Sequence, residues 1–167
     1  GLRSTRSTLL QCLITLMLLW QQHLRKTRMQ LHGPARVFKS VVDLAIEGTF
    51  NGFNAEMAAR IGASNYVREF RTVHISMGRR IGKTEYILSH HREHDLLIVH
   101  NEQMKKDCYR YGVTADVLTP RELKGDLSKY HWIWIDEPRL CTRDTMGMGW
   151  FYGAKFSSDS LVIMLGE

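Results

Sequence analysis

Cysteine and proline are scarce in this chain, with three of each among 167 residues. The cysteines Cys12, Cys108 and Cys141 are far apart and form no C-x-x-C pair. This spacing offers neither a zinc ribbon nor a disulfide framework, so we expect buried, reduced thiols and a reducing compartment. Internal repeats and low-complexity segments are also missing, which excludes solenoid and linker-like architectures.

Long apolar runs are missing as well. The densest run, Leu9 to Trp20, has basic residues on both sides and is shorter than the roughly 20 residues that a membrane-spanning helix needs. It is open to three interpretations: a secretory signal without a small-residue cleavage site, an organelle transit peptide, or a helix that packs on the domain or on a second copy. We favour the packed helix and expect no stable membrane span.

Acidic residues are missing from the first 42 positions, which hold seven of the 23 basic residues and none of the 17 acidic ones. The remainder therefore carries 16 basic against 17 acidic residues, although the whole chain has a formal charge of +6. A basic segment of this kind indicates a polyanionic partner, either nucleic acid or a membrane surface. The alternative is a solvated basic helix without a partner.

The remaining sequence has enough apolar residues, 44% of the chain, to bury a core. Apolar runs of strand length alternate with helical patterns, which predicts an α/β fold with a parallel sheet covered by helices on both faces. We expect a basic helical N-terminal extension over residues 1–69, packed on a core over residues 70–167. The expected helices are 35–47, 55–61, 83–91 and 102–111, and the expected strands include 95–100, 115–118, 130–136 and 160–165.

The core begins with a strand around Val73 and Ile75 that runs into a basic, glycine-containing turn, after which Gly82, Lys83 and Thr84 open a helix. This order is typical of a phosphate-binding loop, whose backbone N–H groups and helix N-terminus hold an anion. Met77 stands where the usual pattern has glycine, and an accidental strand–turn–helix is the alternative. Lys83 would reach the β- and γ-phosphates of ATP, Thr84 would bind Mg²⁺, and Gly82 would adopt a positive φ. The predicted nucleotide-binding residues are Gly78, Arg79, Arg80, Ile81, Gly82, Lys83 and Thr84.

A second motif follows about fifty residues later, where the apolar run from Tyr130 to Ile135 ends in Asp136 and Glu137. Such a run predicts a strand buried on both faces, and two carboxylates at its end favour a cation or solvent at the sheet edge. Asp136 would hold the Mg²⁺ shell and Glu137 would activate the attacking water. A strand followed by an acidic turn is the simpler interpretation.

The stretch Gly78–Thr84, with the later Trp134-Ile135-Asp136-Glu137, resembles the ATPase domain of phage terminase large subunits, the DNA-packaging motors. Residues 119–123 add a more distant similarity to helicase-type ATPases. The resemblance implies an ASCE/RecA-like P-loop core, Mg-dependent ATP hydrolysis coupled to translocation or packaging of double-stranded DNA, and a role for Arg79 in hydrolysis. It also implies self-assembly or a partner protein, and a cytoplasmic location, in the host if the protein is viral.

Other interpretations stay open. The basic segment and a loose helix-turn-helix pattern over residues 55–69 favour a nucleotide-sensing DNA-binding or assembly protein without appreciable turnover. A phosphotransferase is the rival within the enzymes, although the second acid, Glu137, argues against it. Residues 90–94 match the H-x-x-E-H pattern of some zinc peptidases, but their position at a helix end favours a solvated polar terminus.

Overall fold

The structure of the protein is a computed structural model that describes residues 33–78, 81–141 and 149–167. The chain divides into two compact units, Gly1–Arg36 and Val37–Glu167, and the second contains the whole sheet. Residues 37–69, which the sequence analysis placed in an extension, therefore belong to the same compact unit as the sheet. Within the described ranges, no helix combines the length and the apolar character needed to cross a bilayer.

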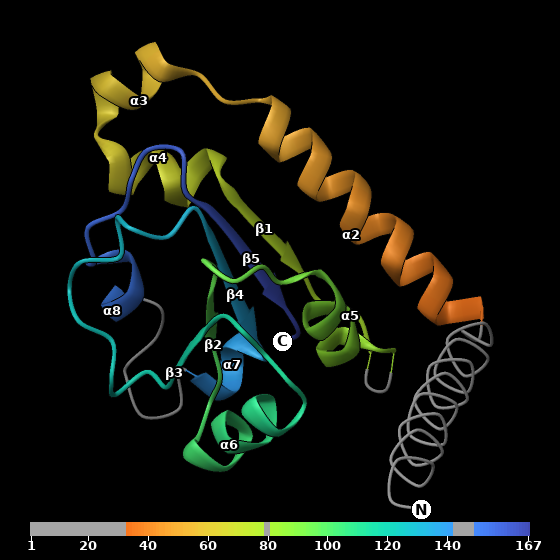
Figure 1. Cartoon of the computed structure of the whole chain (residues 1–167). Helices are drawn as coiled ribbons and strands as arrows, with labels where there is room; N and C mark the ends of the chain where they lie inside the picture. Colours follow the sequence, from red (N-terminus) through yellow and green to blue (C-terminus); the bar gives the residue numbers. More distant parts are fainter. Residues whose placement is uncertain (1–32, 79–80, 142–148) are drawn as a thin grey trace, which may run out of the picture. The chain divides into compact units, whose positions relative to one another are not determined.

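Five parallel strands form one sheet in the order β1-β5-β4-β2-β3 (Figure 1). The predicted α/β class with a parallel sheet is thus confirmed. The last strand pairs with both the strand before the basic turn and the strand that ends in Asp136. The strands are β1 (Thr72–Ile75), β2 (Leu96–Ile98), β3 (Asp116–Leu118), β4 (Trp132–Asp136) and β5 (Leu161–Leu165).

Both faces of the sheet are buried, which explains why its strands are apolar without alternation. Within β4, Ile133 and Ile135 pack into one core cluster and Trp134 packs into the other. The Trp134 indole N–H donates to Asp95 Oδ2 at 2.8 Å. The one polar atom of this large buried side chain therefore has a hydrogen-bond partner. The cluster around Trp134 includes side chains from α2, α5 and α6, and the opposite cluster includes side chains from α4, α7 and α8.

Two of the helices begin at asparagine N-caps. Asn54 caps α3 by accepting a hydrogen bond from the Met57 N–H, and Asn101 caps α6 in the same way through the Met104 N–H. The expected helix 55–61 is confirmed and stops at Gly62, whose φ of +85° suits glycine. The helices are α2 (Gly33–Asn51), α3 (Ala55–Ile61), α4 (Ala63–Phe70), α5 (Lys83–His90), α6 (Glu102–Arg110), α7 (Pro138–Cys141) and α8 (Gly149–Tyr152).

Helix α2 is longer than expected, and its apolar residues are not all on one buried face. Phe38 and Val42 are buried, whereas Val37, Val41 and Leu44 are 56%, 41% and 68% exposed. Apolar residues surround most of this helix, but only the stripe through Phe38 and Val42 meets the core cluster. The buried face of α2 is therefore narrower than its set of apolar residues.

Candidate functional site

The carboxyl ends of three neighbouring strands carry the two predicted motifs to one edge of the sheet. Ile75 of β1 is in register with Leu165 of β5, and Leu165 is in register with Asp136 of β4. The loop after β1 and the acids after β4 therefore start at the same level. In open parallel sheets this edge is the usual place for ligands.

The described part of the turn before α5 includes two glycines, Gly78 and Gly82. Gly82 is the residue before the helix and has a φ of +86°, in the left-handed region where glycine is favoured. Lys83 is the first residue of the helix, where the leading N–H groups have no intrahelical partner. By contrast, Gly78 has no positive φ, and a Cβ placed there would meet nothing within 4 Å.

Thr84 and Asp136, which are 52 residues apart, make a direct hydrogen bond. The Thr84 Oγ1–H donates to Asp136 Oδ2 at 2.9 Å. The other carboxylate oxygen, Oδ1, is buried and has no hydrogen-bond partner, although Asp136 is only 4% exposed. Burial raises the pKa of the Asp136 carboxyl, and the Thr84 hydroxyl offsets part of that rise. A buried carboxylate with one unsatisfied oxygen beside a hydroxyl is a set of hard oxygen donors that fits Mg²⁺.

The described residues contain no group of three or more His, Cys, Asp or Glu side chains that could hold a metal ion. Thr84 and Asp136 supply one hydroxyl and one carboxylate, the kind of oxygen ligands that Mg²⁺ takes together with waters and substrate phosphates. Helix α5 ends at His90, so His90 and His94 do not lie on one continuous helix. His90 instead stacks on Tyr86, with ring centroids 3.9 Å apart.

Lys83 and Glu137 form an ion pair in the same place, with Nζ and Oε1 2.5 Å apart. The lysine side chain is 8% exposed and the glutamate side chain 30%, so the pair joins a buried cation to a carboxylate at the rim. Glu137 has a φ of +53°, which is uncommon for a residue with a side chain. With this backbone conformation, the Glu137 side chain extends toward Lys83 of α5.

The structure brings together the predicted site residues Gly82, Lys83 and Thr84 with the acidic pair at the end of β4. Ile81 is partly buried and packs against the core cluster under α5, so its side chain supports the loop. Gly78 belongs to the described loop, but no close contact singles it out. The predictions for Arg79 and Arg80 lie outside the described residues.

Sequence reasoning missed Gly166 and His74. The Gly166 N–H donates to the Ile75 carbonyl at 3.0 Å, and His74 Nε2 lies 3.1 Å from the Gly166 carbonyl oxygen. These contacts fasten the end of β5 to the loop strand. The only signal in the sequence was a glycine directly after a buried strand. Its contact His74 is 92 residues away in the sequence, so neighbouring residues do not indicate the interaction.

The two described cysteines, Cys108 and Cys141, are buried, as expected. Burial raises the pKa of the Cys108 thiol to about 11 and that of Cys141 to about 12. Both are therefore neutral thiols at physiological pH and are unsuited to nucleophilic chemistry. Cys12 lies outside the described residues.

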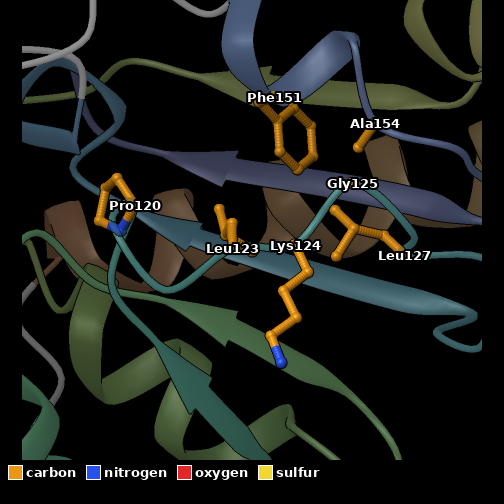
Figure 2. A pocket seen from close by; sticks show the side chains of 7 residues that line it. All are labelled: Pro120, Leu123, Lys124, Gly125, Leu127, Phe151 and Ala154. Atoms are coloured by element: carbon orange, nitrogen blue, oxygen red, sulfur yellow. The ribbon is translucent and has the colours of Figure 1, made fainter.

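A separate pocket of about 140 Å³ lies between the loop after β3 and α8. Figure 2 shows Phe151 and Ala154 on one side of it and Leu123 and Leu127 on another, while the ammonium group of Lys124 points away from these apolar side chains. Among the described residues that line it, none is an acid or carries a hydroxyl. The predicted site residues Lys83, Thr84, Asp136 and Glu137 do not line this pocket.

Comparisons with protein-family models, with curated proteins and with solved structures return no match for the chain. A functional proposal therefore rests on the geometry of the residues at the sheet edge.

Proposed function

We propose that the chain is a Mg-dependent P-loop ATPase with an ASCE-type core. The observation that carries the proposal is the hydrogen bond between Thr84 and Asp136, next to the ion pair between Lys83 and Glu137. The sequence assigned these four residues from two motifs, each of which had a plain structural alternative. An accidental Gly-Lys-Thr turn and an unrelated acidic turn have no reason to pair residue by residue in this way.

Nucleotide binding would use the groups at the start of α5. The N–H groups after Gly82 and the positive end of the helix dipole favour an anion at this point. The Lys83 ammonium is buried and is paired with the Glu137 carboxylate. Phosphate oxygens would replace the glutamate on Lys83, so the cation stays paired in both states.

Thr84 and Asp136 would hold the metal ion, through the hydroxyl oxygen and the unpartnered Oδ1. Bound Mg²⁺ supplies positive charge that stabilises the phosphate oxygens during phosphoryl transfer. Asp136 also orients the Thr84 hydroxyl by accepting its hydrogen bond, which holds both oxygen donors in place before the ligand arrives.

Glu137 would act as the general base once Lys83 is paired with phosphate. Its carboxylate takes a proton from water while the water oxygen bonds to the γ-phosphorus and the bond to the bridging oxygen breaks. ADP and inorganic phosphate are the products. Arg79, by the terminase resemblance, or its neighbour Arg80 would add charge stabilisation to the same step.

The proposal extends to double-stranded DNA as the polymer on which this ATPase acts, with self-assembly or a partner protein completing the motor. The terminase resemblance and the seven basic residues among the first 42 support this part. The alternative is a DNA-binding or assembly protein that senses nucleotide without appreciable turnover, which the same basic segment also favours.

The test is ATP turnover with Mg²⁺, with and without double-stranded DNA, for the wild type, Glu137→Gln and Lys83→Ala. We expect DNA to raise the wild-type rate and Glu137→Gln to lower it by about 10²–10⁴-fold while ATP still binds, because only the proton acceptor is removed. Lys83→Ala should weaken ATP binding itself, because it removes the buried cation.

Glu122→Gln is the matched control, since Glu122 forms an equally short ion pair, with Lys105, away from the site. It should leave turnover unchanged. ATP binding without turnover in the wild type would favour the nucleotide-sensing alternative. Absence of ATP binding, or unchanged turnover in Lys83→Ala, would contradict the assigned site.

A further inference from the structure

Gly166, directly after β5, leaves a space that the Glu137 side chain occupies. A Cβ built on Gly166 would lie 2.4 Å from Glu137 Oε2, 2.8 Å from its Cδ and 3.0 Å from its Cα. Contacts below 3.0 Å essentially never occur for real Cβ atoms, so any residue other than glycine would force Glu137 to move. Gly166 also has a φ of +129°, which other residues rarely adopt.

The backbone on both sides of this space is fastened by hydrogen bonds. The Gly166 N–H donates to the Ile75 carbonyl of β1, and the Glu137 N–H donates to the Leu165 carbonyl, both at 3.0 Å. The strand ends therefore resist separation, and a clash at Gly166 would be relieved mainly by movement of the glutamate side chain.

The remaining contacts of the Glu137 carboxylate define where that side chain now lies. Oε1 is 2.5 Å from Lys83 Nζ, and Oε2 accepts a longer hydrogen bond, of 3.4 Å, from the Glu167 N–H. The carboxylate thus lies between the buried lysine of α5 and the end of β5. Without a side chain at residue 166, it can face the position that a γ-phosphate on Lys83 would take.

We infer that Gly166 is a positioning residue for Glu137, and that its missing side chain sets the place from which the glutamate acts on water. The inference rests on the proposed ATPase function, because the role of the glutamate belongs to that proposal. The atoms nearest to a Cβ at Gly166 all belong to Glu137, so the effect of a substitution should pass through that residue.

Gly166→Ala tests the inference. We expect kcat for ATP to fall by about 10²-fold, as a shift of the reacting group by about 1 Å can cause. The Kd for ATP should stay unchanged or decrease, because displacement of Glu137 weakens its competition with phosphate for Lys83. A merely structural role would instead weaken binding and turnover together.

Gly112→Ala is the matched control. Gly112 has a φ of +80°, but a Cβ there would meet nothing within 4 Å, so this variant introduces backbone strain without a clash. Its turnover should equal that of the wild type. In a Glu137→Gln background, Gly166→Ala should cause no further decrease in turnover, because the group through which it acts is already inactive.

The outcomes separate this inference from the proposed function. Wild-type turnover in Gly166→Ala, or a full additional decrease in the Glu137→Gln background, would overturn the positioning role alone. A wild-type protein that neither binds nor hydrolyses ATP would overturn the proposed function, and the inference with it. If Gly166→Ala does not fold, recovery of folding in Glu137→Ala/Gly166→Ala would support the predicted clash, and failure of both variants would overturn it.

Discussion

The Asp136 carboxylate is buried at the end of β4 with one oxygen bonded to Thr84 and the other unpartnered. Burial without a full set of partners favours the neutral form of the group, which is why its pKa is raised. A charged residue in this position makes the ligand-free protein less stable than a neutral one would. A cation that binds with the ligand would offset this loss of stability, whereas a purely structural role for Asp136 would not explain it.

We therefore predict that Asp136→Asn raises the free energy of unfolding at neutral pH by about 1 kcal/mol and abolishes Mg-dependent ATP binding. The amide keeps an acceptor for the Thr84 hydroxyl but carries no charge. Thermal unfolding and ATP titration with and without Mg²⁺ would check both parts. Asp107→Asn, at a partly exposed carboxylate on α6, should change neither quantity. A lower melting temperature for Asp136→Asn would contradict this account.

At the scale of elements, Arg71 joins three segments at the amino ends of the strands. Its guanidinium donates to the carbonyl oxygens of Thr49 and Phe50 at the end of α2, at 2.7 and 3.0 Å, and to that of Asp159 before β5, at 3.0 Å. The rings of Phe50 and Phe53 lie 5.7 and 5.5 Å from its Cζ. Arg71 is 2% exposed, so these contacts replace water at its two terminal nitrogens, while its Nε is buried without a hydrogen-bond partner.

We predict that Arg71→Met lowers the free energy of unfolding by about 3 kcal/mol, because three carbonyl groups lose their donor. Urea unfolding followed by circular dichroism would measure the decrease. Arg68→Met is the control, since the Arg68 side chain is half exposed and forms an ion pair with its neighbour Glu69. That variant should change stability by less than about 0.5 kcal/mol. Equal effects of the two substitutions would show that the buried network adds little.

At the scale of the whole molecule, charge is segregated along the chain. The first 42 residues are basic without a single acid, and the rest is almost neutral. If double-stranded DNA is the partner, its phosphates would be neutralised mainly by this segment. Removal of a cation that pairs with a phosphate should then reduce the salt dependence of binding.

Substitution of Arg25, Lys26 and Arg28 by glutamine should therefore weaken DNA binding and reduce the slope of log K against log salt. The expected reduction is about 0.9 for each phosphate that is no longer neutralised. Binding titrations with a short duplex at several salt concentrations would measure both quantities. The matched control replaces Lys124, Lys129 and Lys155 by glutamine, which removes the same charge from the neutral part. An equally large effect in the control would contradict a specific role for the basic segment.

Several features of the site were predictable because they depend on neighbours in the sequence. A strand, a glycine-containing turn and Lys83-Thr84 at a helix start form a local pattern, and so does an apolar strand that ends in two acids. Local patterns do not specify which strand ends become neighbours. The hydrogen bond from Thr84 to Asp136 and the pairing of Lys83 with Glu137 therefore became evident only in the folded sheet.

The sequence by itself determined the α/β class, the parallel sheet and the residues that carry the candidate chemistry. These features depend on the spacing of apolar residues and on turn residues, which are signals within a few neighbouring positions. Only the tertiary structure decided which apolar residues of α2 are buried, and that Gly166 borders Glu137. Both depend on contacts between segments far apart in the chain. The space at Gly166 exists because β5 inserts between β1 and β4, and the local sequence around Gly166 does not specify that strand order.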